Sequence, residues 1–303
     1  MEVVAIVASF LQDLNACMES ILTIKGVITK TVGSSSNQVH TFLSQPAYGK
    51  PPHQYEWLIN GRINGSLVEA LADTGANVNA ISEDEASTRG LKPEPGTAGR
   101  RIKLPSGKDC MTLGTTTVGF QFQGEDVVHS LSCSIVERLE YKFILGFDFL
   151  RKTETLSRFK HRIKEVLLSG VRKFSLRLLD AFDVPDEAKT RMYSRIDGKP
   201  AVIVPDTGSS IMAVSASYAR RRRLQIDRSQ KTVVRFAQGS TAQTTGTVIA
   251  TWKFQSSSTN TDTEHEQQMG DSWEYEWHVI EGLSVDGIVN VDFHQIPQRL
   301  WKL

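Results

Sequence analysis

The chain has 303 residues, a formal net charge of +1 and 23% charged residues. At roughly 100–200 residues per domain this length predicts about two domains, and the near-neutral charge gives no reason to expect nucleic acid or a membrane surface as a partner. The three cysteines, Cys17, Cys110 and Cys133, predict free and mostly buried thiols, with a Cys110–Cys133 bridge as the alternative. The seven histidines are scattered without ligand spacing, so we expect neither a metal nor a cofactor.

Residues 1–30 are predicted to form an amphipathic helix. Their apolar residues recur at steps of three and four, at Val3, Val7, Phe10, Leu14, Cys17 and Ile21. Glu2 stands where a secretion signal has a basic start, and no stretch is apolar enough to span a membrane. We therefore expect a cytoplasmic protein. Residues 2–24 resemble the opening helix of the N-terminal domain of fungal NLR-type proteins, which implies a fungal source and a protein partner for this helix.

A tripeptide that occurs twice organises the rest of the chain. Asp73-Thr74-Gly75 returns 133 residues later as Asp206-Thr207-Gly208. In each copy a tight-turn dipeptide, Asn64-Gly65 or Asp197-Gly198, precedes an apolar run that ends on the aspartate. This pattern is typical of a mostly buried strand that delivers a loop. Two copies at the same place in two matching stretches predict a duplicated lobe.

The match between the two units continues beyond the tripeptides. A short strand with a serine helix N-cap comes next, then a hairpin with glycine at its turn, then a closing apolar segment. The matching pairs are 78–82 with 211–215, 102–108 with 234–240, and 144–149 with 288–293. Asn290 stands where the first unit has Gly146, and a polar loop insertion is predicted over 256–272.

The stretch between the units predicts a basic amphipathic helix over 151–191. Residues 151–177 contain nine Lys or Arg but only two Glu, and apolar residues recur at helical spacing. These apolar residues are Phe159, Ile163, Val166, Val171, Phe174 and Leu178. We expect the apolar stripe to pack on a neighbouring lobe; binding to a membrane, a calmodulin-like protein or RNA is the alternative.

Two segments of the first unit resemble the retropepsin family of aspartic peptidases. They are Leu71-Ala72-Asp73-Thr74-Gly75-Ala76 and Phe143-Ile144-Leu145-Gly146-Phe147-Asp148-Phe149-Leu150. The resemblance covers residues 56–150 and, more loosely, 192–297. It implies a mainly β fold of two tandem acid-protease lobes of β-barrel type, with an N-terminal helix and a helical connector between the lobes.

The resemblance also implies roles for individual residues. Asp73 and Asp206 would be the catalytic pair, Thr74 and Thr207 would brace the two loops, and Gly75 and Gly208 would permit their tight backbone. The hairpins would be flaps over a polypeptide substrate. The flap residues are Ser106, Gly107, Gln238 and Gly239.

The chemistry of the family explains why two copies are needed. One ionised carboxylate takes a proton from a water, while the other, protonated carboxyl group donates a hydrogen bond or a proton to the scissile carbonyl. The pair therefore shares one proton. We expect a monomeric pseudo-dimer that is an aspartic endopeptidase. The alternatives are an active homodimer that pairs Asp73 with Asp73, and an inactive tandem scaffold that binds peptides or proteins. Pro205 and Asn290 depart from the family pattern in the second unit.

The predicted domain organisation follows from these motifs. After the N-terminal helix, residues 31–54 form a linker, because they hold turn formers without a sustained period. The first lobe covers 55–150, the connector 151–191 and the second lobe 192–303. The run Arg220–Arg223 is interpreted as a solvated helix end, with nuclear localisation as the alternative.

Overall fold

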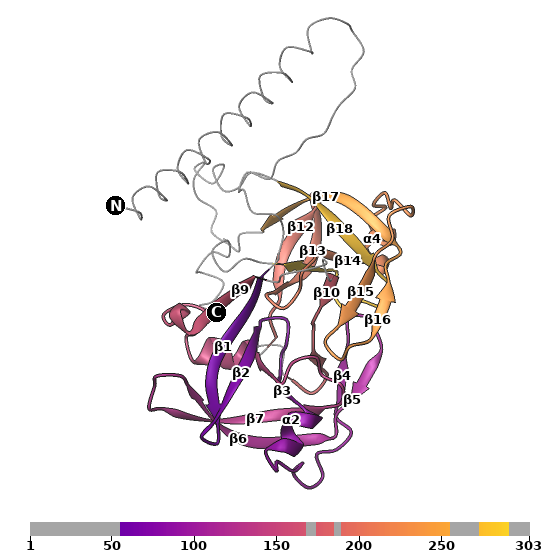
Figure 1. The fold of residues 1–303 in the computed structure, drawn as a ribbon. Helices are drawn as coiled ribbons and strands as arrows, with labels where there is room; N and C mark the ends of the chain where they lie inside the picture. Colours follow the sequence, from indigo (N-terminus) through magenta and orange to yellow (C-terminus); the bar gives the residue numbers. More distant parts are fainter. Residues whose placement is uncertain (1–54, 168–173, 185–188, 255–272, 291–303) are drawn as a thin grey trace, which may run out of the picture. The chain divides into compact units, whose positions relative to one another are not determined.

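The computed structural model describes residues 55–167, 174–184, 189–254 and 273–290. The predicted N-terminal helix, the linker over 31–54 and the insertion over 256–272 lie outside these ranges. Among the described residues, none of the helices has the length and apolar character that crossing a membrane requires. The described chain is mainly β, as predicted, and its strands form two lobes (Figure 1).

The first lobe is a seven-stranded sheet in the order β2-β8-β3-β7-β6-β1-β9, and a further pairing joins β2 to β1. Its strands are β1 (Tyr55–Ile63), β2 (Ser66–Asp73), β3 (Asn79–Ser82), β6 (Gly114–Phe122), β7 (Val128–Val136), β8 (Phe143–Gly146) and β9 (Ile163–Leu167). A hairpin of β4 (Arg101–Lys103) and β5 (Asp109–Met111) projects from it. The short helices are α2 (Glu83–Thr88) and α3 (Phe147–Lys152).

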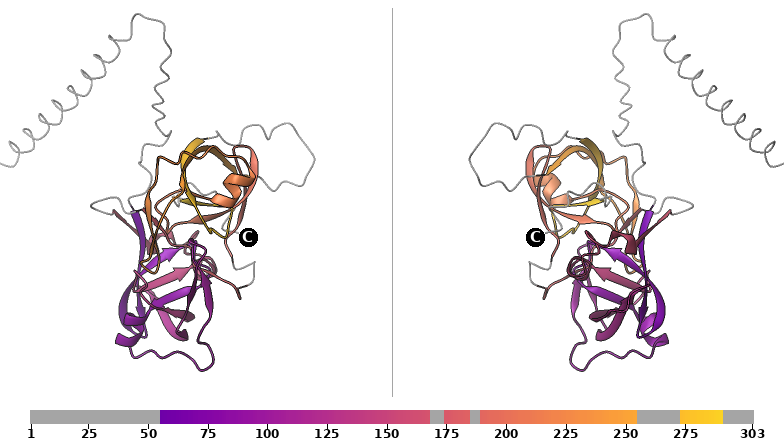
Figure 2. Two further views of the ribbon diagram at one scale, coloured as in Figure 1. Left: turned by 90° about the vertical axis from the view of Figure 1, so that its right-hand side faces the viewer. Right: turned by 90° about the vertical axis from the view of Figure 1, so that its left-hand side faces the viewer.

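The second lobe is a closed barrel in the order β12-β13-β19-β14-β18-β17, seen at the top of both views in Figure 2. Its strands are β12 (Met192–Ile196), β13 (Lys199–Asp206), β14 (Ala213–Ser215), β17 (Gly246–Phe254), β18 (Trp273–Ile280) and β19 (Gly287–Asn290). Its hairpin consists of β15 (Val233–Phe236) and β16 (Thr241–Gln243), and its helix is α4 (Ala216–Arg221). Elements therefore recur in the same order as in the first lobe.

The turn chemistry read from the sequence is confirmed in both lobes. Asn64 and Gly65 have φ of 48° and 85° between β1 and β2, and Asp197 and Gly198 have φ of 49° and 69° between β12 and β13. Positive φ at both central residues defines the hairpin turn whose twist matches that of its strands. Each turn thereby starts the strand that ends on an aspartate.

Separate apolar residues fill each lobe. Phe120 lies against Phe122, Phe143 and Phe149 in the first lobe, with ring centroids 5.1–5.8 Å apart. In the second lobe Trp277 is fully buried and its indole donates to the carbonyl of Ala250. Such aromatic packing supplies much of the burial that holds a small β lobe together.

The predicted free thiols are confirmed for the two cysteines that the structure describes. Cys133 is buried in β7 and Cys110 is half-buried in β5, and neither forms a disulfide. The alternative of a Cys110–Cys133 bridge is therefore wrong.

The prediction of a helix over the connector is wrong for the residues that the structure describes. After α3 the chain forms a 3₁₀ turn (Lys160–Arg162), β9, β10 (Phe174–Leu176) and β11 (Asp180–Ala181). β9 pairs with the free edge of β1, from Ile59 opposite Ile163 to Tyr55 opposite Leu167. An unpaired sheet edge is a strong template for a β-branched, apolar segment, so tertiary pairing outweighs the helical spacing.

Candidate functional site

The two aspartates of the repeated tripeptide end equivalent strands. Asp73 ends β2 opposite Gly146 of β8, and Asp206 ends β13 opposite Asn290 of β19, both in parallel pairs. Each aspartate is completely buried. The apolar runs before them thus deliver one carboxyl group from each lobe to a single place.

The threonines beside the aspartates join the two lobes by crossed hydrogen bonds. The backbone N–H of Thr74 donates to Oγ1 of Thr207 at 3.1 Å, and the N–H of Thr207 donates to Oγ1 of Thr74 at 3.0 Å. Each hydroxyl then donates across to the other lobe, from Thr74 to the Pro205 carbonyl and from Thr207 to the Ala72 carbonyl, both at 2.8 Å. We call these four bonds the threonine cross-brace.

Glycine is required at the third position of both tripeptides because the opposite carboxyl group lies against it. A Cβ atom added to Gly75 would lie 2.5 Å from Cγ of Asp206, and one added to Gly208 would lie 2.9 Å from Cγ of Asp73. Both distances are too short for any larger residue. The backbone N–H groups of the glycines instead donate to Asp73 and Asp206 at 2.8 and 2.7 Å.

Burial and mutual contact set the charge of the aspartate pair. Burial, followed by the charge of Asp206, raises the pKa of Asp73 well above its ordinary value. Burial also raises the pKa of Asp206, but hydrogen bonds from the Ser209 hydroxyl and the Gly208 amide oppose that rise. Oδ2 of Asp73 is buried and receives no hydrogen bond from any described N–H or hydroxyl, so a proton shared with Asp206 is the partner that fits it. Asp73 therefore holds the proton more tightly.

Each of the two glycine hairpins reaches the opposite lobe. Gly107 and Gly239 turn their hairpins with φ of 75° and 76°. A Cβ on Gly107 would lie 2.6 Å from the Gly282 carbonyl in the second lobe, and Ala237 of the second hairpin accepts from the Glu140 N–H in the first lobe at 2.9 Å. A pocket between the hairpins is lined by Cys110, Met111, Glu137, Arg138, Gln238, Gly239 and Ser240.

The remaining predicted hairpin residues also lie at these turns. Ser106 precedes Gly107, and its hydroxyl is buried without a hydrogen-bond partner in the described structure. Gln238 donates from Nε2 to Ser240 at 2.7 Å, while its Oε1 is buried and unpaired among the described residues.

Comparison with known proteins agrees with this geometry. Residues 59–152 match the family model of the gag-polyprotein putative aspartyl protease. The first lobe is therefore retropepsin-like. The match covers the strand into Asp73, the first hairpin and the closing segment around Gly146, which are the features that carried the resemblance in the sequence. No curated protein matches the chain.

Two solved structures are similar to parts of the chain. The retroviral protease-like domain of Ddi1 from Leishmania major is 20% identical over 33% of this chain and 78% of its own, with a TM-score of 0.26. The EIAV protease, solved with the inhibitor HBY-793, is 18% identical over 36% of this chain and 94% of its own, with a TM-score of 0.22.

The retropepsin-like arrangement accommodates both departures of the second lobe. Pro205 lacks an N–H, but the threonine cross-brace uses only its carbonyl. A side chain in place of Gly146 would meet the carbonyls of Ala76 and Val78, whereas Asn290 turns its amide to donate to the carbonyl of Ser209. Neither change separates the two aspartates.

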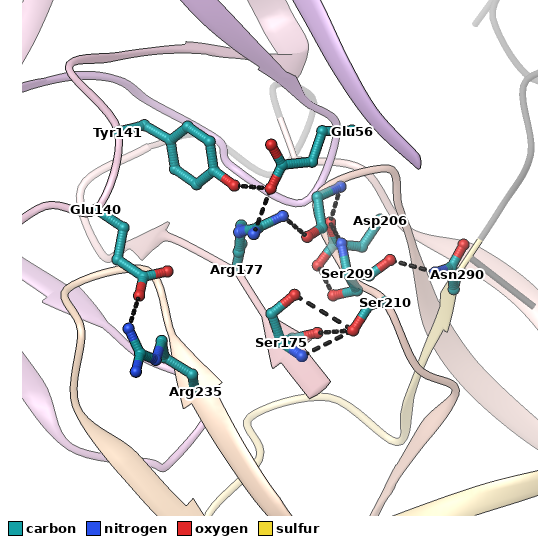
Figure 3. Close-up of polar contacts among 11 residues, drawn as sticks. Glu56, Glu140, Tyr141, Ser175, Arg177, Asp206, Ser209, Ser210, Arg235 and Asn290 are labelled. Carbon is teal, nitrogen blue, oxygen red and sulfur yellow. Dashed lines mark hydrogen bonds and ion pairs between the residues drawn. The ribbon is translucent and has the colours of Figure 1, made fainter. Parts of the chain in front are cut away.

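Sequence reasoning missed three residues beside the retropepsin-like pair. Arg177 donates to the Gly208 carbonyl at 2.7 Å and to Glu56 at 3.0 Å, and its guanidinium lies 4.6 Å from the centre of the Tyr141 ring (Figure 3). The Tyr141 hydroxyl also donates to Glu56. The predicted helix over the connector gives no reason to expect Arg177 beside the aspartates.

The described residues include no cluster of three or more His, Cys, Asp or Glu side chains that could hold a metal ion.

The threonine cross-brace predicts a specific loss of stability. Thr207→Val keeps the size of the side chain but leaves the Thr74 N–H and the Ala72 carbonyl without their partner. We expect a cost of about 1–3 kcal/mol in the free energy of unfolding, measured by urea denaturation. Thr207→Ser keeps the hydroxyl and should cost clearly less; equal losses in the two variants would contradict the cross-brace.

The raised pKa of Asp73 predicts a pH dependence of stability. Because the folded chain binds a proton that the unfolded chain releases above about pH 3.9, the stability from this group is complete below that value and is lost as pH rises through the folded pKa. Asp73→Asn removes this loss. The variant should therefore gain on the wild type as pH rises, by up to about 1.4 kcal/mol per pH unit, in urea unfolding between pH 4 and 8. Parallel stability curves would mean that Asp73 titrates normally.

Proposed function

We propose that the chain is an aspartic endopeptidase that hydrolyses extended polypeptides at Asp73 and Asp206. The observation that carries this proposal is the pairing of two buried aspartates, one from each lobe, by the threonine cross-brace. Buried carboxyl groups in contact share one proton, and a shared proton is what this hydrolysis needs.

The hydrogen bonds favour different roles for the two carboxyl groups. Asp206 accepts from the amides of Gly208 and Ser209 and from the Ser209 hydroxyl, so it is the better-stabilised anion and the general base. It takes a proton from a water, whose oxygen bonds to the scissile carbonyl carbon. Asp73 donates its proton to the carbonyl oxygen, which gives a tetrahedral diol. Proton transfer to the nitrogen then breaks the C–N bond and leaves a carboxyl and an amino terminus.

The same bonds favour a site made by one chain. The cross-brace joins the loop that carries Asp73 to the loop that carries Asp206. A homodimer that pairs Asp73 with Asp73 would therefore first have to break four buried hydrogen bonds. We therefore propose a monomeric pseudo-dimer with a polypeptide as its substrate. A protein partner for residues 2–24 and a cytoplasmic location remain parts of this proposal.

An inactive peptide-binding scaffold is the second candidate. The observation in its favour is Asn290, whose side chain replaces a family glycine and holds the carbonyl of Ser209 next to the site. Such a scaffold would bind peptides in the same place and cut none.

A cleavage assay tests the proposal. Hydrolysis of unfolded protein at mildly acidic pH should fall at least about 100-fold in both Asp73→Asn and Asp206→Asn, because each removes one partner of the acid–base pair. Asp84→Asn changes an exposed aspartate of α2 and should keep full activity. Activity retained by Asp206→Asn but lost by Asp73→Asn would favour the homodimer. No hydrolysis at any pH, either by the wild type or by Arg177→Met with Glu56→Gln, would favour the scaffold.

A further inference from the structure

The part of the connector over 174–181, which we call the cleft segment, lies between the two hairpins and the two aspartate loops. β10 at its start pairs with β15 of the second hairpin, from Phe174 opposite Val234 to Leu176 opposite Phe236. β11 at its end pairs with β4 of the first hairpin, where Asp180 is opposite Lys103. The cleft segment is thus held as an added strand by both hairpins in turn, and Figure 1 shows β10 beside β15.

The aspartate loops hold the cleft segment from the other side, at equivalent positions. Ser210 and Asn77 occupy the same place in their lobes, 133 residues apart. The N–H of Ser210 donates to the Ser175 carbonyl at 2.9 Å, and the N–H of Asn77 donates to the Leu179 carbonyl at 3.0 Å. The Arg177 carbonyl is halfway along the chain between these two acceptors. The middle of the cleft segment is therefore held between the two aspartate loops, where the Arg177 side chain reaches the Gly208 carbonyl.

Side chains fix the cleft segment in apolar and polar sites. Leu176 and Leu178 pack with second-lobe residues such as Val204 and Phe236, and Leu179 packs with first-lobe residues such as Ala76. All three leucines are at most 1% exposed. Removing three leucine side chains from water is strongly favourable, so the segment competes with any external chain for the same surface.

Arg177 adds an anchor beside the aspartates. Its guanidinium donates a hydrogen bond to the Gly208 carbonyl, forms an ion pair with Glu56 and stacks on the Tyr141 ring (Figure 3). Its charge also lowers the pKa of both Asp73 and Asp206, after burial has raised them. A positive charge at this point favours loss of the proton that the pair must share, so the occupied cleft opposes catalysis as well as entry.

We propose that the cleft segment is a tethered inhibitor, which occupies the polypeptide groove and must leave before an external chain can bind. This rests on the proposed function for its effect on hydrolysis, but its effect on peptide binding is independent of catalysis. The groove that it fills accepts an extended peptide with leucine-sized apolar residues at the positions that Leu176, Leu178 and Leu179 now hold.

The test measures binding of a labelled octapeptide to the full chain carrying Asp73→Asn, which prevents cutting. The octapeptide has the sequence of residues 174–181 with methionine in place of its arginine, so that its own binding does not require Glu56. Arg177→Met with Glu56→Gln removes the anchor without leaving a buried charge unpaired. The apparent affinity should rise at least tenfold, because it scales with the fraction of chains whose groove is free. The matched control is Arg162→Met with Glu125→Gln, a partly buried pair whose arginine lies over the Phe122 ring in the first lobe, and it should leave the affinity unchanged.

Hydrogen exchange on the unaltered chain gives a second measurement that needs no variant to fold. The amides of Asn77 and Ser210 should exchange slowly, and exchange at the rate of exposed loop amides would overturn the proposal. Equal peptide affinity in the anchor variant and its control, or no peptide binding to either, would also overturn it. So would self-cleavage of the wild type between Arg177 and Leu178, because the segment would then be a substrate. The peptide affinity could rise in the anchor variant while no chain with both Asp73 and Asp206 intact hydrolyses protein. In that case the proposed peptidase function is wrong, but the proposal that the cleft segment blocks the groove is supported.

Discussion

The threonine cross-brace is the interaction on which the arrangement of the site depends. Two carboxyl groups that repel one another when ionised are brought together out of water, and neither would remain there without a fixed backbone behind it. Thr74 and Thr207 supply that backbone by bonding each loop to the other lobe. The strands, the tight turns and the glycines at positions 75 and 208 serve this one contact, since a side chain on either glycine would collide with the opposite aspartate.

The cleft segment of the connector lies between the two hairpins and the two aspartate loops, so the groove of this symmetrical site is filled. A chain that passed behind the lobes would leave the groove free, but here β10 and β11 complete both hairpins and bring Arg177 beside the pair. The same main-chain bonding that would recognise a polypeptide substrate is satisfied internally. On this account the activity of the protein is governed by how often the cleft segment leaves.

The parts of the fold that local chemistry determines could be predicted from the sequence. Asn64-Gly65 and Asp197-Gly198 fix their turns, and the apolar runs fix β2 and β13. The repeated tripeptide and its resemblance to the retropepsins predict the pairing of Asp73 with Asp206. The connector could not be predicted, because Ile163 and Leu176 take their conformation from strand edges that the distant β1 and β15 provide. Arg177 was missed for the same reason: its partners Glu56 and Gly208 are far away in sequence.

The sharing of a proton between Asp73 and Asp206 is the central claim, and carboxyl titration by nuclear magnetic resonance tests it most directly. With ¹³C-labelled aspartate, and with Asp73→Asn to assign its signal, the Asp73 carboxyl of the wild type should titrate well above the ordinary aspartate pKa of about 3.9. Its pKa should fall in Asp206→Asn, because the neighbouring charge is gone. An Asp73 signal that titrates near the ordinary value, or that is the same in the wild type and in Asp206→Asn, would contradict the account.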